Sequence, residues 1–377
     1  MTNKLLFVVT EDWYFCSHRF ELALAAKAAG FDVIVATRMG EYKDRIEAVG
    51  FRFYEVPFSR SLRHPWRDVV SFLALLKIYR REKPGIIHHV SLKPVLLGSL
   101  AARLCRTGHI VNALTGLGYL FTDTASGRAP FLRRLIHIVL RWLLCGNRVW
   151  TIMQNADDAG LLENMKILHP GHTIVIRGSG VDIQRFRPSP EPATMPKVLL
   201  ASRMLRDKGV IEFVDAARIL LQEKLEAEFI LAGSIDKENP SAIEEAEIRQ
   251  WEKEGLVKWI GHQKEMVPVL VDSHIVCLPS YREGLPRVLL EAAATGRPIV
   301  ATDVPGCREI VHQGENGFLV PVKDPVALAD AIKRLVTDPV LRRRMGEKGR
   351  KIVESDFANG IVHEQTLALY ERLLRTA

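Results

Sequence analysis

Short apolar runs alternate with helix-length segments along this chain, and the whole alternation occurs twice. The runs are rich in Val, Ile and Leu at successive positions, which predicts strands that are buried on both faces. Because such strands form parallel sheets with helices on each side, the expected fold is α/β and doubly wound. The strands are expected at 5–10, 32–37, 51–56, 85–89, 109–114 and 148–153, and again at 197–201, 227–232, 257–260, 275–278, 299–301 and 317–320. The helices are expected at 18–29, 42–49, 66–81, 94–106 and 130–146, and again at 209–223, 242–254, 286–295, 325–336, 339–354 and 360–374.

A proline-rich segment separates the two series. Prolines punctuate residues 188–196, which predicts a linker between a first domain at 1–187 and a second domain at 197–359. The last segment, 360–377, is expected to form a helix that packs back on the first domain. Since ligands of open α/β sheets bind outside the carboxyl ends of the strands, two Rossmann-like domains that face each other would place a ligand in a central cleft.

The formal net charge is +8, and the basic excess is confined to the first half of the chain. Residues 1–190 contain 26 Lys and Arg against 15 Asp and Glu, whereas the remainder contains 26 against 29. This excess predicts an anionic partner, which leaves nucleic acid, an anionic membrane surface and a phosphorylated substrate open. Nucleic acid is disfavoured, because the tyrosines and tryptophans are scattered and do not form aromatic-plus-basic clusters.

The cysteine count and the length of the apolar segments exclude further classes of protein. The number of cysteines, five, is odd and no CxxC pair occurs, so neither a disulfide framework nor a zinc ribbon is expected. The N-terminus has no long apolar region with a small-residue cleavage site, and no window is long and apolar enough to predict a transmembrane helix. We therefore expect a cytoplasmic protein.

The segment 279–298, PSYREGLPRVLLEAAATGRP, has the pattern of an anion-binding loop that leads into a helix. Pro286 lies where the helix is expected to begin. The backbone N–H groups of Gly284 and Leu285 precede it, and N–H groups at the start of a helix suit a diphosphate. Glu283 and Glu291 are separated by about 10 Å if the segment is helical. This distance matches the span from a sugar ring to a ribose across a diphosphate, and each carboxylate can accept hydrogen bonds from hydroxyls.

Two basic residues follow the strand expected at 197–201. Arg203 and Lys208 lie in a loop before a helix, where two cations can neutralise a diphosphate and stabilise the charge that develops on a leaving group. No Asp-x-Asp sequence and no cluster of His with carboxylates occurs, and the adjacent His88 and His89 lack the spacing of metal ligands. No metal and no cofactor are therefore expected.

The Glu-x7-Glu element, within EGLPRVLLEAAATGRPIVATDVPGCREIV, resembles the retaining nucleotide-sugar glycosyltransferases of family 4, which have the GT-B fold. Other elements agree in order and spacing, namely GSGVD at 178–182, ASRMLRDKG at 201–209, LAGS at 231–234 and GHQ at 261–263. The resemblance implies that Glu283 contacts the donor sugar and Glu291 the donor ribose, and it adds Gly233 and Gln263 to the donor-binding residues. The donor would be a UDP-sugar, which is a co-substrate.

The first domain departs from the pattern of that family in two places. In the loop expected at 11–19, Ser17, His18 and Arg19 stand where family members have a glycine-rich turn, and they are candidates for binding the acceptor phosphate or the donor. After the strand at 109–114, Thr115 followed by Gly116 stands where many members have a histidine, and both residues are candidates for binding the acceptor.

The TGLG sequence at 115–118, with the segment 58–65 that contains Arg60, resembles a narrower group of the family. Arg60 is also a candidate for binding the acceptor, through contacts to phosphate or to a lipid headgroup. This group comprises the bacterial N,N'-diacetylbacillosaminyl-diphospho-undecaprenol N-acetylgalactosaminyltransferases and their O-antigen and capsule relatives. The resemblance implies transfer of an N-acetylhexosamine from a UDP-sugar to a saccharide linked to undecaprenyl diphosphate.

The helix expected at 130–146 has a narrow basic stripe on a broadly apolar surface. At 100° per residue, Arg133, Arg134 and Arg141 fall in one sector with His137, and Trp142 belongs to the apolar remainder. This pattern favours a helix that lies in the interface of an anionic membrane, here the inner face of the bacterial cytoplasmic membrane. A core-facing helix with one solvated face is the alternative.

Three hypotheses follow. The first is a membrane-associated, retaining GT-B glycosyltransferase that uses a UDP-sugar and a lipid-linked acceptor. The second is a soluble GT-B enzyme that acts on a small sugar or glycan, or a UDP-sugar epimerase. The third, a nucleic-acid binder, is supported by the net charge alone.

Overall fold

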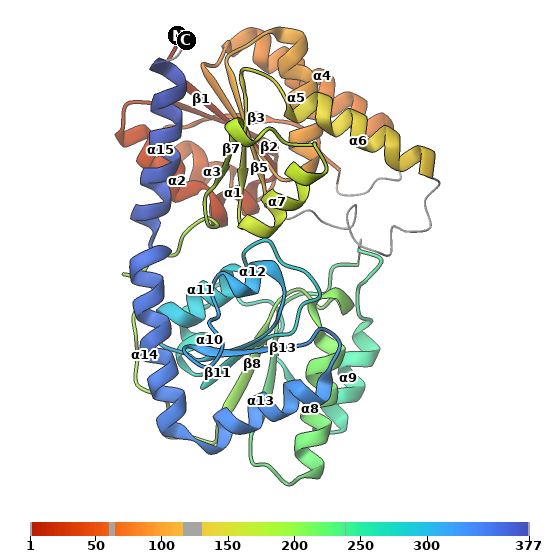
Figure 1. Cartoon of the computed structure of the whole chain (residues 1–377), viewed down its shortest axis with the longest axis vertical. Helices are drawn as coiled ribbons and strands as arrows, with labels where there is room; N and C mark the ends of the chain where they lie inside the picture. Colours follow the sequence, from red (N-terminus) through yellow and green to blue (C-terminus); the bar gives the residue numbers. More distant parts are fainter. Residues whose placement is uncertain (1, 60–64, 116–129, 238, 376–377) are drawn as a thin grey trace. The chain divides into compact units, whose positions relative to one another are not determined.

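The computed structural model describes residues 2–59, 65–115, 130–237 and 239–375, with the backbone alone for 65 and 130–136. The chain forms two compact units (Figure 1). The first unit comprises Met1–Ser179 together with Gly360–Ala377, and the second unit comprises Gly180–Asn359.

The first unit is built on a parallel sheet of seven strands in the order β3-β2-β1-β4-β5-β6-β7. Its strands are β1 (Lys4–Glu11), β2 (Asp32–Arg38), β3 (Arg52–Glu55), β4 (Ile86–Val90), β5 (His109–Leu114), β6 (Val149–Met153) and β7 (Thr173–Val175). Its helices are α1 (Asp12–His18), α2 (Phe20–Ala28), α3 (Lys43–Ala48), α4 (Pro65–Glu82), α5 (Leu92–Cys105), α6 (Pro130–Leu144), α7 (Ala156–Asn164) and α15 (Asn359–Arg375), with a 3-10 turn at Pro170–His172. The six strands expected here are all present, whereas β7 and α7 were not predicted. β7 is a short, half-exposed edge strand, so its side chains give no continuous apolar run.

The second unit is built on a parallel sheet of six strands in the order β10-β9-β8-β11-β12-β13. Its strands are β8 (Lys197–Ala201), β9 (Glu228–Ala232), β10 (Lys258–Trp259), β11 (Ile275–Leu278), β12 (Ile299–Thr302) and β13 (Gly317–Val320). Its helices are the 3-10 turn η4 (Arg206–Lys208), α8 (Val210–Gln222), α9 (Glu245–Lys253), α10 (Val267–Val271), α11 (Arg287–Ala294), α12 (Pro305–Arg308), α13 (Pro325–Thr337) and α14 (Pro339–Asp356). The two doubly wound sheets confirm the expected fold class.

The C-terminal helix α15 belongs to the first unit, where Figure 1 shows it beside α2. Val362, Leu369 and Leu373 are buried in the same apolar core as β1 and α2. The hydroxyl of Tyr370 is hydrogen-bonded to Nδ1 of His88, in the middle of the sheet. The first unit is therefore completed by residues from the far end of the chain.

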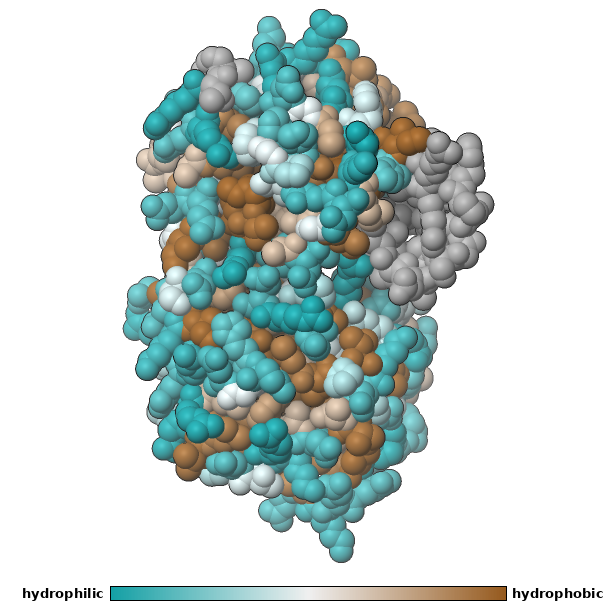
Figure 2. All heavy atoms as spheres, in the orientation of Figure 1, coloured by the Kyte–Doolittle hydropathy of each residue, from teal (hydrophilic) through white to brown (hydrophobic). Residues whose placement is uncertain are grey.

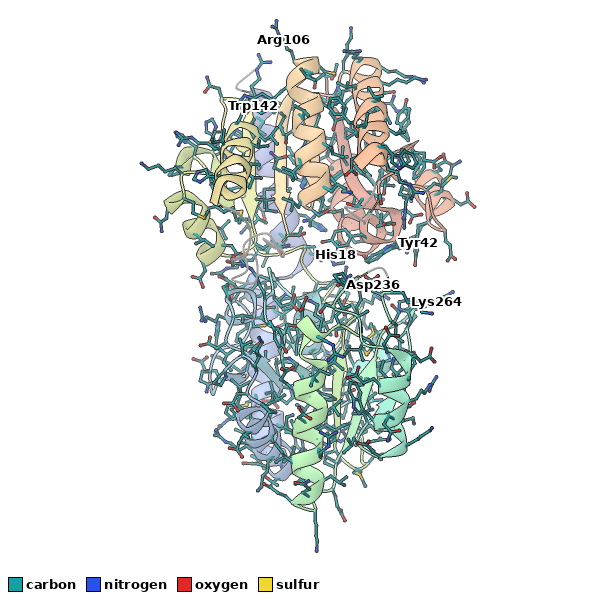
Figure 3. All side chains as sticks on the ribbon, turned by 90° about the vertical axis from the view of Figure 1, so that its right-hand side faces the viewer. His18, Tyr42, Arg106, Trp142, Asp236 and Lys264 are labelled. Carbon is teal, nitrogen blue, oxygen red and sulfur yellow. The ribbon has the colours of Figure 1, made fainter. Side chains whose placement is uncertain are left out.

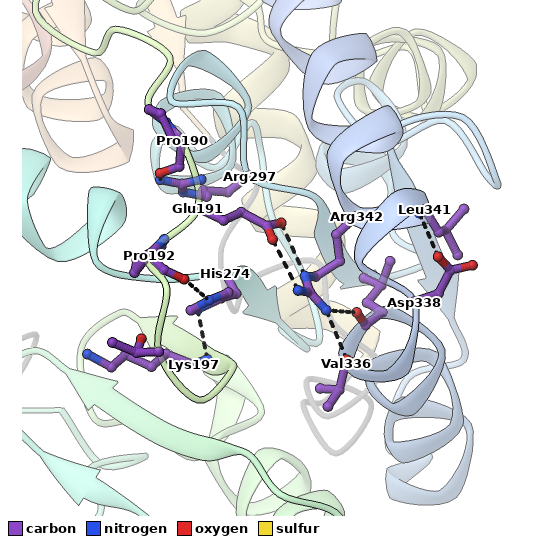
Figure 4. Close-up of polar contacts among 12 residues, drawn as sticks. Pro190, Glu191, Pro192, Lys197, His274, Arg297, Val336, Asp338, Leu341 and Arg342 are labelled. Carbon is purple, nitrogen blue, oxygen red and sulfur yellow. Dashed lines mark hydrogen bonds and ion pairs between the residues drawn. The ribbon is translucent and has the colours of Figure 1, made fainter.

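The proline-rich segment 188–196 is not a linker between the units, because the unit boundary lies before Gly180 and the segment packs within the second unit. Arg342 forms a bidentate ion pair with Glu191, with N–O distances of 3.0 and 3.1 Å (Figure 4). Arg297 donates to the carbonyl of Pro190, and the ring of His274 contacts the carbonyl of Pro192. The prolines thus mark an extended segment that buried side chains hold in place.

The adjacent histidines of β4 point to opposite faces of the first sheet, as successive strand residues do. His88 contacts Tyr370 on the α15 side, whereas His89 contacts Tyr79 of α4 and Asn112 of β5. Both imidazoles are buried, and burial lowers the pKa of His89 to about 4. Each neutral ring therefore serves the packing of its own face.

Candidate functional site

The strand order of the second sheet reverses between β8 and β11, which makes the carboxyl ends of these two strands the expected ligand-binding position. The loop after β8 carries Lys208, and the loop after β11 carries Glu283. Nζ of Lys208 lies 2.5 Å from Oε1 of Glu283, although 75 residues separate them in sequence. Both side chains are mostly buried, so the pair is shielded from solvent.

Two glycines allow the loops to approach each other this closely. Gly209 has a φ of +71°, and a Cβ there would lie 2.1 Å from the carbonyl oxygen of Pro279. A Cβ on Gly306 of α12 would lie 2.5 Å from the carbonyl oxygen of Gly284 and 2.7 Å from that of Glu283. The backbone around Glu283 is therefore confined by α12.

Glu291 lies on α11 and has a different partner from Glu283. Its Oε1 accepts a hydrogen bond from Nε of Arg287 at 2.8 Å, one helical turn away. Burial raises the pKa of the Glu291 carboxyl, although Arg287 opposes this shift. The helix begins at Arg287, one residue later than expected, and Pro286 is its extended N-cap residue. The side chain of Leu285 is buried in the core below the loop.

Arg203 and Gln263 also lie at this edge of the second sheet, but each has its own partner. Nη1 of Arg203 lies 2.6 Å from Oδ2 of Asp236, and the Arg203 side chain is half exposed. Gln263 donates to the carbonyl of Ile260. The N–H of Gly233 donates to the carbonyl of Gly261 at 2.7 Å, which joins the loops after β9 and β10. Asp236 and Lys264 are labelled at this edge in Figure 3.

Two hydrogen bonds of Tyr281, which were not predicted, brace the loop that carries Glu283. The hydroxyl of Tyr281 donates to Oε1 of Glu212 on α8 at 2.6 Å, and the N–H of Tyr281 donates to the carbonyl of Asp207. Nζ of Lys323 lies 4.9 Å from the centre of the Tyr281 ring. An aromatic residue two positions before Glu283 was a signal in the sequence, but its partner on α8 had none.

The residues expected at 11–19 lie on a helix and not in a loop. α1 occupies Asp12–His18, so Ser17 and His18 form its last turn, and His18 stacks on Tyr14 at 4.1 Å between ring centres. Arg19 follows at the junction with α2 and is buried, although a solvent-accessible loop position was expected for it. Figure 3 labels His18 at one edge of the first unit.

The other candidate residues of the first unit are only partly described. Thr115 follows β5 directly and is half-buried. Arg60 and Gly116 lie outside the described residues, as do the side chains of Arg133 and Arg134.

Two family profiles match the chain. That of glycosyl transferases group 1 matches residues 182–352, and that of glycosyl transferase 4-like proteins matches residues 4–144. Together they span most of both units. The two matches together identify the chain as a glycosyltransferase.

Alignments with similar proteins cover nearly the whole length of this glycosyltransferase. It is 26% identical to the N,N'-diacetylbacillosaminyl-diphospho-undecaprenol alpha-1,3-N-acetylgalactosaminyltransferase of Campylobacter jejuni, over 95% of each chain. It is 25% identical to the UDP-Gal:alpha-D-GlcNAc-diphosphoundecaprenol alpha-1,3-galactosyltransferase of Escherichia coli, over 76% of this chain and 75% of that one. The structure resembles sucrose-phosphate synthase from Thermosynechococcus elongatus with a TM-score of 0.82 and 21% identity, over 99% of this chain and 100% of the other. This likeness confirms the expected GT-B fold.

The helix α6 of the glycosyltransferase has both a side that faces the core and an exposed side with basic and apolar groups. Leu140, Leu143 and Leu144 are buried, whereas Arg141 and Trp142 are exposed. The guanidinium of Arg103 on α5 lies 5.0 Å from the ring centre of Trp142. Figure 3 labels Trp142 on α6. One side of α6 therefore packs on the core, and its other side presents basic and apolar groups to solvent.

The helix α4 has an exposed apolar stripe that was not predicted. Trp66, Val69, Val70 and Leu73 are spaced as one helical face, and Trp66 and Leu73 are 60% and 56% exposed. α4 and α6 both pack on α5, and Figure 2 shows apolar surface in this part of the first unit. Apolar residues exposed at this spacing indicate an interaction surface.

Within the described ranges, no three His, Cys, Asp or Glu side chains are grouped as metal ligands would be. None of the helices described for this glycosyltransferase is long and apolar enough to cross a bilayer.

Proposed function

We propose that this glycosyltransferase moves an N-acetylhexosamine from a UDP-sugar, with retention of configuration, to a saccharide linked to undecaprenyl diphosphate. The observation that carries the donor part is the Lys208–Glu283 pair at the switch point of the second sheet. A cation and a carboxylate that meet there suit a diphosphate and the hydroxyls of the sugar attached to it. The acceptor part is supported by the names of the two relatives, which both specify a diphospho-undecaprenol acceptor and an alpha linkage.

In the proposed reaction, the bond between the anomeric carbon and the diphosphate oxygen breaks, and UDP leaves with the electron pair. Lys208 and Arg203 stabilise the negative charge that develops on the leaving diphosphate. The acceptor hydroxyl attacks the same face of the sugar, and its proton passes to the departing phosphate oxygen. Glu283 positions the sugar, and Glu291 accepts hydrogen bonds from the ribose. No step requires a metal ion.

Substitution of Lys208 tests the donor site. Lys208→Ala should lower kcat/KM for transfer from a radiolabelled UDP-sugar to crude lipid-linked acceptor by roughly 10²–10³, because one electrostatic contact to the leaving group is lost. Lys253→Ala, at an exposed position on α9, is the matched control and should leave the rate unchanged. Full activity of Lys208→Ala would refute the assignment. A screen of UDP-sugars by calorimetry, followed by product analysis, tests the choice of donor sugar and the retained linkage.

We further propose that α4 and α6 bind the inner face of an anionic membrane. The apolar stripe of α4 has Arg67 beside it, and the exposed side of α6 combines Trp142 with Arg141. Such a combination of apolar and basic groups suits the boundary between acyl chains and acidic headgroups. The basic excess in residues 1–190 acts in the same direction.

Flotation with vesicles tests this membrane surface. The protein should float with phosphatidylglycerol vesicles but not with phosphatidylcholine vesicles, and high salt should reduce the bound fraction. The pair Trp66→Ser and Trp142→Ser should abolish binding, whereas Trp13→Ser, which removes an exposed tryptophan from α1, should not. If wild-type protein shows no salt-sensitive binding, the soluble enzyme acting on a small sugar or glycan becomes the better hypothesis.

A further inference from the structure

Arg19 is a buried cation whose charge has no carboxylate partner among the residues that the structure describes. It lies between α1 and α2 and is 5% exposed. Nη1 donates a hydrogen bond of 3.3 Å to the carbonyl of the neighbouring His18, and Nε is buried with no partner. Burying a charge in this state costs stability, because the lost hydration is not replaced. An anion bound beside Arg19 would compensate for this lost hydration.

A small cavity lies beside this guanidinium. Its polar lining consists of Arg19, His88 of β4, Ser179 after β7, and His363 and Thr366 on successive turns of α15. No carboxylate lines it. Nε2 of His88 is also buried without a hydrogen-bond partner. The cavity therefore joins a cation to polar side chains from three other parts of the chain.

The cavity lies at the edge of the first sheet where ligands of such sheets bind. Gly178 and Ser179 follow the carboxyl end of β7, and Arg19 follows the helix that succeeds β1. Ser179 and His363 are partly exposed, so they form its mouth, whereas Arg19 and His88 are buried.

The electrostatics of the cavity favour a single negative group. Burial lowers the pKa of His88, and burial together with Arg19 lowers the pKa of His363 to about 4. Both imidazoles are therefore neutral at pH 7, and the charge of the cavity is that of Arg19. A neutral imidazole and a hydroxyl can each still donate one hydrogen bond to an oxyanion.

We propose that this cavity is a second anion site of the enzyme, which binds the terminal oxygens of a phosphate group. Arg19 forms the charge-assisted hydrogen bonds, and Ser179 and His363 donate from the mouth. Donors on several sides suit the oxygens of a tetrahedral oxyanion. The site shares no residue with the donor site of the second unit. The phosphate comes either from free inorganic phosphate or from the diphosphate of the lipid-linked acceptor, and the second source rests on the proposed function.

Thermal unfolding in the presence of saturating UDP, which occupies the donor site, tests the proposal. Inorganic phosphate should raise the unfolding temperature of the wild-type protein by a few degrees, because a ligand that binds the folded state stabilises it. Arg19→Met should abolish this rise. Arg148→Gln, which replaces an exposed arginine of the same unit, should retain it.

The unfolding temperature of Arg19→Met in phosphate-free buffer shows whether Arg19 serves a ligand or only the packing of the fold. A buried charge kept for a ligand is a cost in the free protein, so Arg19→Met should unfold at the same or a higher temperature in phosphate-free buffer. Ser179→Ala, a milder change at the mouth, should weaken phosphate binding several-fold and keep the fold.

Farnesyl diphosphate distinguishes the two sources. If it binds at least tenfold more tightly than phosphate and is displaced by phosphate, the site holds the diphosphate of the acceptor. If phosphate binds as tightly, the site holds the free ion. The absence of any phosphate-dependent shift in wild-type protein, or its persistence in Arg19→Met, would overturn the anion site. Because neither result requires glycosyl transfer, the anion site and the proposed function can fail independently.

Discussion

Replacement of Gly306 by alanine should displace the loop that carries Glu283 while the rest of the second unit stays folded. The new Cβ would lie 2.5 Å from the carbonyl oxygen of Gly284, whereas real Cβ contacts are essentially never shorter than 3.0 Å and ordinary ones begin at 3.4 Å. The peptide between Glu283 and Gly284 must therefore move by about 0.5–0.9 Å. A misplacement of about 1 Å at a reacting centre can cost a factor of about 10², so we expect kcat/KM to fall roughly 10- to 50-fold.

The fall in activity can be separated from a loss of folding. Overpacking of this kind costs about 1–3 kcal/mol, and each kcal/mol lowers the unfolding temperature by about 2–4 °C in a chain unit of this size. Turnover of the UDP-sugar is therefore measured well below the unfolding transition. Gly160→Ala is the matched control, because a Cβ there meets no atom within 4 Å and should leave turnover unchanged. A Gly306→Ala protein that is folded and retains wild-type kcat/KM would show that α12 does not position Glu283.

Three further substitutions test the packing and the charges of the fold. Arg342→Ala should lower the free energy of unfolding in urea by about 3–5 kcal/mol, because it leaves Glu191 without its buried partner, and Glu191→Gln should cost less. The pKa of Glu291 is raised in the folded protein, so its ionisation costs stability as the pH rises through that pKa. Glu291→Gln should therefore be at least as stable as wild type at pH 7, and the difference in unfolding free energy should vanish below about pH 4. The affinity of this variant for UDP should fall roughly tenfold, because a hydrogen bond is lost. A difference in stability that widens at acid pH would contradict this prediction. Tyr370→Phe leaves Nδ1 of His88 unpaired and should cost about 1–3 kcal/mol in urea unfolding, and no loss would mean that this buried bond contributes nothing net.

Most of the fold followed from the sequence, because a strand that is apolar on both faces is a strong local signal. The strands at 109–114, 197–201, 275–278 and 317–320 have the same limits in the structure as in the prediction. The elements that were missed are short or half-exposed, such as β7 and α12, and their composition differs little from that of a loop.

The parts of the site that were not foreseen depend on contacts between distant segments. The residue types at Lys208 and Glu283 predicted contacts to a diphosphate and a sugar. The contacts that hold the Glu283 loop in place were not predictable, because they come from α12 and from Glu212 on α8, which are distant in sequence. Arg19 was predicted to lie in a loop. Its burial could not be predicted locally, because His363 and the other α15 residues around it come more than 300 positions later in the sequence. Likewise, the prolines at 188–196 indicated an extended segment, but nothing local revealed that arginines would fasten it to one unit.

The path of the chain also has a consequence for how this protein is made. The second unit is inserted between Ser179 and Gly360 of the first, and where the chain leaves and returns, Val181 and Ala358 pair side by side. During translation, the second unit can therefore fold while the first unit still lacks α15. Part of the apolar face of the N-terminal sheet stays uncovered until α15 emerges, so the unit that is started first is completed only after the inserted unit has been translated.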